Sequence, residues 1–368
     1  MKGIVLAITI LLALFSSGCW DARDLGKTEI AIVSAHDLIR EEEKTKEQDQ
    51  IMISFLTPVM DKDAKEKSRI IKAAGETVGD ARAVRANRYS TVTVTEIKST
   101  LLGESLARQG LSDTLEVLYR NPFLSYQDNL AVVEGNAGDV LKPKTTVNIG
   151  ETINSLLEEI PEQNFVPRVT LADFRKDVLN YGRNPVLPML SKMGEDDVEI
   201  SGLAVFKKDR MVGKFDQNQM KYLTLLRGEK ANGVITYLLP GTEDVYVTLS
   251  GTNSRKVNVE LTEDKAYINI DIFLVVDIIE VQKNYIFNEN LERFQLTEEG
   301  AQDYIVSKCG EVLAYLQNDY QVDALNIGAA ARARYGKEIE FLDWDRLFAG
   351  SDITVNAQVK IRNYGAIK

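Results

Sequence analysis

The sequence predicts an α+β fold of more than one domain, in which mixed and largely antiparallel sheets pack against helices. An apolar share of 44% beside 27% charged residues is typical of a globular chain. The expected strands and helices do not alternate as regular βαβ units, which argues against a doubly wound sheet. After residue 199, alternating strands follow one another across short polar turns, as antiparallel hairpins do. A length of 368 residues allows two or three domains.

The first eighteen residues have the composition of a secretory signal peptide. Lys2 precedes the apolar stretch 4–15, and small residues occupy positions 16–18. As a helix, this stretch is about 18 Å long, too short for a hydrocarbon core of about 30 Å. Cys19 follows directly, which is the arrangement of a bacterial lipoprotein; an ordinary secreted protein with a cysteine there is the alternative. We expect residues 1–18 to be cleaved and Cys19 to carry N-palmitoyl and S-diacylglycerol groups.

The formal net charge of −11 limits the partners of the chain. Negative charge repels phosphates, so no nucleic-acid partner is expected. No block of four to eight Lys and Arg residues would hold the protein on anionic lipid, so membrane attachment depends on the acyl chains of Cys19. With Cys19 acylated, only Cys309 remains and no intramolecular disulfide can form. Cys309 lies on a helical apolar stripe and is expected to be a buried thiol.

Hydrophobic periodicity predicts the elements of the first half. We expect strands at 28–39, 50–56, 90–95 and 129–133, and helices at 75–87, 100–120, 151–160 and 170–180. The helical stretch 100–120 is broken at Gly110, and Ser112 is a plausible N-cap for its second part. Thr170 followed by Asp173 predicts a capping box.

Pro185, Pro188 and the polar stretch 192–197 indicate a domain boundary between regions 19–192 and 193–368, the first of which could hold two subdomains. Beyond it we expect strands at 199–206, 211–215, 234–239, 245–250, 257–261, 266–281 and 353–361, and helices at 216–228, 298–320 and 323–335. Asp216 with Gln219 should cap the helix that Gly228 ends.

Residues that could carry out chemistry are few. His36 is the only histidine, which removes most zinc sites, and a surface or half-buried histidine at a strand end is favoured over a triad member. Asp271 and Asp277 share one face of a strand; exposure on an outer face is favoured over a buried catalytic pair. The other acidic pairs are explained by solubility and helix ends.

No phosphate-binding loop, dinucleotide fingerprint or calcium loop is present in the sequence. Four aromatic residues near the C-terminus favour a hydrophobic core over a sugar-binding cleft: Tyr335, Phe341, Trp344 and Phe348. The sequence therefore predicts neither catalysis nor a cofactor or metal.

Three segments carry a resemblance to a known family. They are GCWDARDL at 18–25, ISGLAVFKKDRMVGKFDQNQMKYLTLLRG at 200–228, and the end from Asp323 through LDWDRLFAGSDITVNAQVKIRNYG at 342–365. The chain resembles the Ger(x)C spore-germination lipoproteins, and the similarity covers essentially its whole length.

The resemblance implies an α+β, non-catalytic C-type subunit of a nutrient germinant receptor in an endospore-forming bacterium. Such a subunit sits on the outer face of the spore inner membrane beside two integral-membrane subunits, A-type and B-type. Only Cys19, the lipid attachment site, carries over residue by residue. Whether this subunit touches the small-molecule germinant is left open.

Two other classes remain as alternatives. A solute-binding lipoprotein of an importer would need two α/β lobes with a ligand cleft between them, and the antiparallel strands after residue 199 disfavour it. A cell-wall hydrolase would need a deep groove with two convergent carboxylates.

Overall fold

A computed structural model gives the conformation of most of the chain after the first 28 residues. It describes Gly3 and residues 29–39, 41–43, 47–48, 50–59, 68–88, 92–142, 148–162, 164–194, 197–229, 231–262, 265–282 and 291–363. Among these residues, no helix is both long and apolar enough to cross a membrane.

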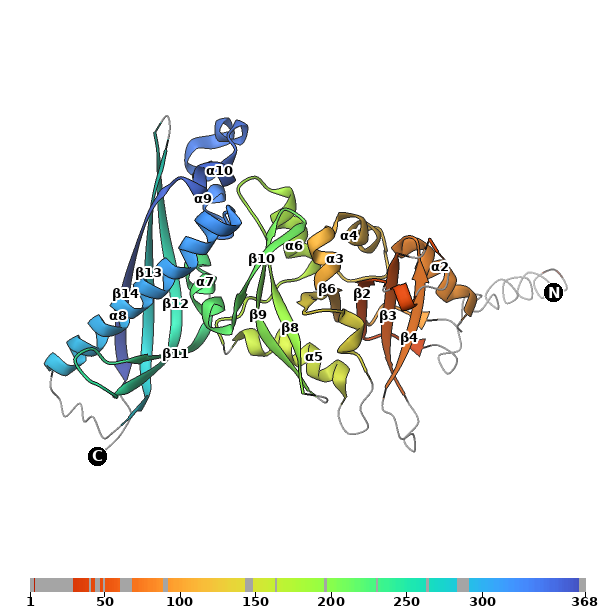
Figure 1. Cartoon of the computed structure of the whole chain (residues 1–368), viewed down its shortest axis with the longest axis horizontal. Coiled ribbons are helices and arrows are strands. Elements are labelled where there is room, and N and C mark those ends of the chain that lie inside the picture. The colour runs from red at the N-terminus through yellow and green to blue at the C-terminus, as the bar shows by residue number, and fades with distance from the viewer. Residues whose placement is uncertain are drawn as a thin grey trace.

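An eight-stranded mixed sheet runs through the first half of the chain (Figure 1). Its strands, in spatial order, are β10 (Arg210–Asp216), β9 (Asp197–Lys207), β8 (Val186–Met193), β7 (Asn129–Val133), β6 (Ser99–Gly103), β2 (Val33–Leu38), β3 (Ile51–Pro58) and β4 (Ser68–Gly75). The four central strands are parallel, and an antiparallel pair lies at each edge. A separate pair joins β1 (Glu29–Ile30) to β5 (Val92–Thr93).

Apolar side chains fill both faces of this sheet, as expected for parallel strands covered by helices. Leu101 and Val133 belong to one buried cluster, whereas Leu102 and Val132 belong to another. The helices of this half are α2 (Val78–Arg88), α3 (Glu104–Gln109), α4 (Ser112–Tyr119), α5 (Ile149–Glu158) and α6 (Leu171–Leu179), with the 3-10 turns η2 (Glu41–Glu43), η3 (Ala137–Asp139) and η4 (Ile160–Glu162).

A second sheet lies at the other end of the long axis of the molecule (Figure 1). Its strands are β11 (Asn232–Leu238), β12 (Tyr246–Leu261), β13 (Ala266–Val281) and β14 (Asp352–Asn363), all antiparallel except that β14 pairs parallel to β13. One face is buried against α8 (Leu291–Ala314), where Ile305 and Val312 pack with the strand residues. The chain then continues through the π-helical η5 (Tyr315–Tyr320), α9 (Ile327–Tyr335), the 3-10 turn η6 (Gly336–Phe341) and α10 (Trp344–Ala349).

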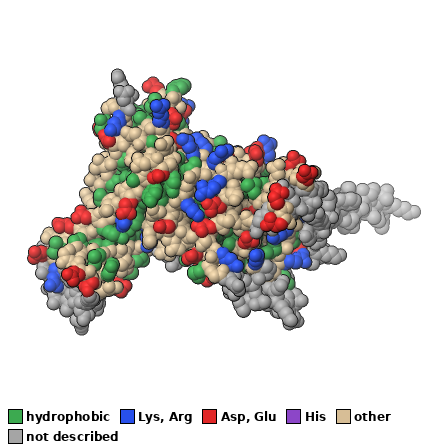
Figure 2. Space-filling model, in the orientation of Figure 1, with side chains coloured by type: hydrophobic (Ala, Val, Ile, Leu, Met, Phe, Trp, Pro, Cys, Tyr) green, Lys and Arg blue, Asp and Glu red, His purple; other side chains and the backbone are tan. Residues whose placement is uncertain are grey.

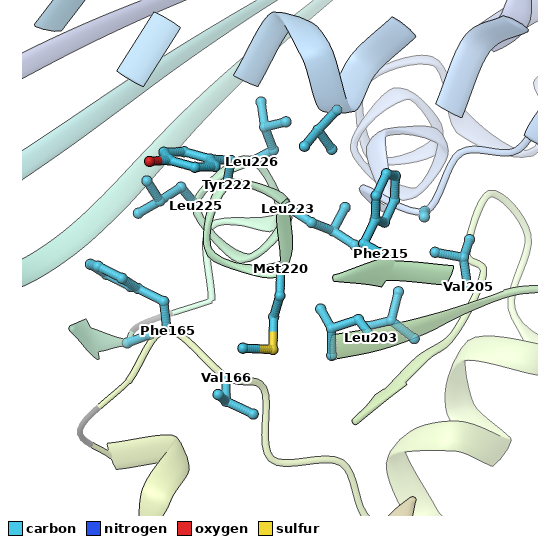
Figure 3. Close-up of a cluster of buried hydrophobic side chains, with 14 of the residues drawn as sticks. Phe165, Val166, Leu203, Val205, Phe215, Met220, Tyr222, Leu223, Leu225 and Leu226 are labelled. Atoms are coloured by element: carbon cyan, nitrogen blue, oxygen red, sulfur yellow. The ribbon is translucent and has the colours of Figure 1, made fainter. Parts of the chain in front are cut away.

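Helix α7 (Gln217–Arg227) lies between the two sheets and packs on both. Its apolar side chains meet residues of β9 and β10 on one side and Phe165 and Val166 on another (Figure 3). Asp216 and Gln219 form the predicted capping box at its start, and Gly228, at φ +69°, ends it in the left-handed conformation. α7 therefore makes the cores of the two sheets continuous.

Two expectations for residues 99–120 are wrong. Residues 99–103 form the buried strand β6 and not a helix. The N-cap of α4 is Leu111, while the hydroxyl of Ser112 donates to Asp209 at 2.7 Å. A short apolar run such as STLLG fits a buried strand as well as a helix, and the neighbouring strands decide between them.

Residues around the predicted domain boundary also differ from expectation. Residues 186–193 form strand β8, which pairs with both β7 and β9. The chain thus passes residue 192 inside one sheet, and the division into regions 19–192 and 193–368 stays a prediction. The strands expected at 245–250 and 257–261 are one continuous strand, β12. The capping box of Thr170 and Asp173 and the strand 129–133 are confirmed.

Candidate functional site at the junction of the two sheets

A cleft of about 1150 Å³ opens where the two sheets meet. Its walls come from α6 and the loop that follows it, from the end of α7, from β12 and from α9. A smaller hollow of about 460 Å³ adjoins it and shares Lys176, Arg183 and Ala329. Segments far apart in sequence therefore build one polar concavity, the kind of place where proteins commonly bind small molecules.

Arg227, at the end of α7, is buried at the base of this cleft. Its Nε donates to Glu229 at 2.6 Å, and its Nη2 lies 3.6 Å from Asp177 of α6. Asp177 also accepts from Arg183 at 3.0 Å. Burial lowers the pKa of Arg227. The attraction of the Glu229 and Asp177 carboxylates is larger than this effect of burial and holds the pKa of Arg227 above its usual value. The network is compensated and ties α6 to α7.

Asp323, in the loop before α9, organises the facing wall. Its carboxylate accepts from Gly328 N and Trp344 Nε1, both at 2.7 Å, and from Leu325 N at 2.9 Å. Burial raises the pKa of Asp323 to about 6, against these donors. With three donors aimed at its oxygens, the carboxylate holds the loop and the start of α10 in place.

Asn184 connects this wall to the eight-stranded sheet. Its side-chain amide donates to Asp345 at 2.9 Å and to the carbonyl of Asp323 at 3.3 Å. Its side-chain oxygen accepts from Lys208 N in the β9–β10 turn at 3.0 Å. The side chain of Asn184 thus links three segments, and its hydrogen bonds fix the wall around Asp323 relative to the eight-stranded sheet.

Gly182 and Gly328 bring two backbones together beside Asn184. Ala329 N donates to Gly182 O at 3.1 Å. A Cβ on Gly182, whose φ is +65°, would lie 2.3 Å from the carbonyl carbon of Gly328. Only glycine fits this contact, because the opposing atoms are backbone and cannot move aside.

Arg255 of β12 lines the cleft without an acidic partner. Its Nη1 donates to the carbonyls of Leu226 and Leu325, the latter at 3.1 Å. No carboxylate of the described residues lies within ion-pair distance of it. Burial lowers the pKa of Arg255 to about 10, which marks a charge that its surroundings compensate only in part.

The predicted lipid attachment site, Cys19, lies outside the described residues. The other candidates fall in different parts of the molecule and do not converge on the cleft. Cys309 is fully buried, and burial raises the pKa of its thiol, as expected for a structural cysteine.

His36 is buried in β2, with 2% of its surface exposed, so the expectation of a surface or half-buried side chain is wrong. Neither ring nitrogen has a hydrogen-bond partner among the described residues. Burial and then the charge of Arg82 lower its pKa to about 4. The adjacent Asp37 accepts from the backbone of Ala137 and Gly138 instead. The two side chains therefore do not form a catalytic pair.

Asp271 and Asp277 lie on the face of β13 that points away from α8, so the expected outer face is confirmed, but both residues are half-buried and not exposed. Asp271 accepts from Asn269 and Asn356, while Asp277 forms two hydrogen bonds with Arg362, at 2.6 and 3.1 Å. Six residues of strand separate them by about 20 Å, too far for two carboxylates to act on one bond. The hydrolase alternative therefore has no support from this pair.

The C-terminal aromatic residues follow the core interpretation in part. Trp344 and Phe348 are buried, and Tyr335 is half-buried with its hydroxyl 3.1 Å from Leu261 N. For Phe341 the interpretation is wrong, because 94% of its surface is exposed. Trp344 contacts Asp323 and so belongs to the wall beside the cleft.

Sequence reasoning missed the residues that build the cleft, above all Arg227, Arg255 and Asp323. Arg255 occupies an ordinary position in an alternating strand, and Asp323 stands at the start of an expected helix. No local motif marks either residue. The carbonyls that hold Arg255 lie 29 and 70 positions away in the chain, and Asn184, which binds the carbonyl of Asp323, lies 139 positions away, so only the tertiary structure could have found these contacts.

Two family comparisons cover both halves of the chain. Residues 21–192 match the family described as "Spore germination protein N-terminal domain", and residues 201–365 match "Spore germination B3/ GerAC like, C-terminal". The chain belongs to the Ger(x)C family of spore germination proteins. Ger(x)C membership makes it a protein of the germinant-receptor subunit type, a family that is not known for enzymes.

Individual Ger(x)C proteins are distant in sequence but match over most of their length. The "Spore germination protein GerQC" of Bacillus cereus is 24% identical over 279 residues, which is 74% of this chain and 75% of the relative. The "Putative spore germination protein YfkR" of Bacillus subtilis (strain 168) is 23% identical over 321 residues, or 82% and 78%. The crystal structure of the GerBC protein superimposes with a TM-score of 0.60 at 16% identity, covering 87% and 96% of the two chains. The predicted α+β fold with mixed sheets is confirmed.

Proposed function

We propose that this chain is the membrane-anchored lipoprotein subunit of a nutrient germinant receptor, acting without catalysis in receptor assembly or signalling. The observation that carries the proposal is the match of both halves to spore germination families, over nearly all residues that follow Cys19. Its place would be the outer face of the spore inner membrane, beside A-type and B-type integral-membrane subunits.

The position of Cys19 supports a specific orientation at the membrane. The first described strand begins at Glu29, ten residues later, and ten extended residues span at most about 35 Å. A lipid on Cys19 would therefore keep the β1 end of the molecule close to the bilayer, with the second sheet at the far end of the long axis (Figure 1). Two acyl chains anchor stably, and confinement raises the effective concentration of weakly binding partners.

The receptor role is tested with spores that lack the gene. Nutrient-triggered germination is followed as the fall in optical density, with dodecylamine, which bypasses nutrient receptors, as the control. We expect loss of the response to one nutrient while the response to dodecylamine is unchanged. Normal responses to every nutrient would contradict the proposal.

Replacement of the lipid attachment site tests the anchor. We expect Cys19→Ala to weaken nutrient germination and to release the protein from the membrane fraction, because no thiol remains to accept the diacylglycerol. Cys309→Ala, which removes the buried thiol and leaves the anchor, is the matched control. Unchanged germination of Cys19→Ala spores at an unchanged receptor level would rule out a need for the lipid.

A further inference from the structure

The junction of the two sheets gathers positive charge in an acidic protein. The chain has 55 acidic and 44 basic residues, yet Lys and Arg side chains concentrate near the middle of one face, over α6 and β10 (Figure 2). The cleft and its adjoining hollow are lined by four carboxylates, those of Glu158, Asp173, Asp177 and Glu229, and by six basic residues besides the buried Arg227: Arg168, Lys176, Arg183, Arg255, Arg332 and Lys337. The smaller hollow has four of these residues and no carboxylate in its lining.

Pairing leaves some of this charge uncompensated. Arg168 pairs with Glu158 at 3.3 Å, Lys176 with Asp173 at 3.0 Å and Arg183 with Asp177 at 3.0 Å. Arg332 pairs with Glu340. Arg255 and Lys337 have no carboxylate within ion-pair distance among the described residues.

Arg255 differs from Lys337 in being fixed and partly buried. Two carbonyl acceptors hold its Nη1, and its Cβ, Cδ and Nε pack over Gly228. Its Nε and Nη2 make no hydrogen bond with the described residues and belong to a side chain that lines the cleft. A guanidinium held in one orientation with two free N–H donors is suited to bidentate contact with an oxyanion.

We propose that the cleft between the two sheets binds a small polar ligand through a carboxylate or phosphate group, with Arg255 as the main contact. A bound oxyanion would supply the counter-charge that Arg255 lacks, and Lys176 at the border of both hollows would add to the attraction. The cleft volume accommodates a small metabolite together with water. Because this binding is a property of the purified protein, it goes beyond the receptor role and can fail without affecting it.

Thermal unfolding of the full-length protein tests the proposal. Inorganic phosphate and malonate serve as the two probes, titrated in place of chloride at constant ionic strength, with glucose as the neutral comparison. We expect a saturable rise of Tm with a Kd of about 1–10 mM for at least one oxyanion and none for glucose, because a ligand that binds only the folded state stabilises it. A response to phosphate alone or to malonate alone identifies which group the site takes.

Substitutions decide whether the response comes from the cleft. Arg255→Gln should weaken binding at least about tenfold, and Arg255→Lys, which keeps the charge without the fork, should restore part of it. Lys176 is exposed, so Lys176→Gln should fold normally and weaken binding about two- to fivefold. Lys98→Gln removes one exposed, unpaired charge outside the cleft and should leave binding unchanged.

Two results would overturn the proposal. One is a wild-type protein whose Tm does not respond saturably to either oxyanion. The other is an equal response in all variants, which would indicate a general salt effect. If Arg255→Gln does not fold, the comparison of Lys176→Gln with Lys98→Gln gives the answer, and equal affinities would count against the cleft.

Discussion

Burial sets the chemistry of His36, the single histidine. A buried imidazole with no hydrogen-bond partner stays neutral, because burial and the charge of Arg82 both disfavour the protonated ring. In the unfolded chain the same ring takes up a proton below about pH 6.5. The imidazole of His36 therefore stays unprotonated in the folded protein down to about pH 4, and it is not placed to catalyse proton transfer.

This difference predicts how stability depends on pH. Between about pH 6.5 and 4 the unfolded state binds one more proton than the folded state, so stability falls as the pH drops through that window. The loss from this one group should reach about 3 kcal/mol at pH 4. His36→Leu removes the titration while filling most of the space. In urea unfolding near pH 7 and pH 4, the wild type should lose about 3 kcal/mol more than the variant. Parallel pH dependence of the two proteins would show that His36 titrates normally.

Among the secondary-structure elements, helix α7 is stabilised by the capping box at its start. Asp216 accepts from Asn218 N at 2.8 Å and from Gln219 N at 2.9 Å, and these amides would otherwise lack partners. Asp216→Ala should lower the free energy of unfolding by about 1 kcal/mol. Asn218→Ala changes an exposed side chain two residues after Asp216. This substitution should alter the free energy of unfolding by less than about 0.5 kcal/mol, as surface substitutions usually do. Urea unfolding of both variants measures the difference, and equal effects would exclude a role for the cap.

Elements with strong local signals could be predicted, whereas those defined by pairing could not. The box at Asp216 and the one at Thr170 are visible in sequence because their hydrogen bonds join residues three apart. Strand β6 is parallel to both of its neighbours, and β8 is parallel to β7 and antiparallel to β9; the apolar runs of both strands are buried on both faces, so they carry no alternation. The neighbours β2 and β7, which place them in the sheet, come from segments 30 to 66 positions away in the chain, although β9 follows β8 directly.

In the molecule as a whole, the orientation of the two sheets depends on the backbone contact between Gly182 and Gly328. Gly182→Ala should cost about 3 kcal/mol, because the new Cβ would clash with the backbone of Gly328 as well as strain the left-handed φ. Gly194 has a similar φ of +62° with nothing within 4 Å of its Cβ position, so Gly194→Ala should cost only about 1 kcal/mol. Thermal unfolding compares the two, and equal losses would show that the contact at the junction does not matter.

The sequence by itself determined the class of the protein: the lipoprotein-like N-terminus with Cys19, the acidic and globular composition, the α+β texture and the resemblance to Ger(x)C proteins. These properties are local or compositional, so they can be read one segment at a time. The tertiary structure alone decided that His36 is buried and that β8 and β9 belong to one sheet. It alone brought Arg227, Arg255 and Asp323 to a common junction. The pairing of Arg227 with Asp177 and the carbonyl contacts of Arg255 join residues 29 to 70 positions apart, and no local pattern records that these residues will meet.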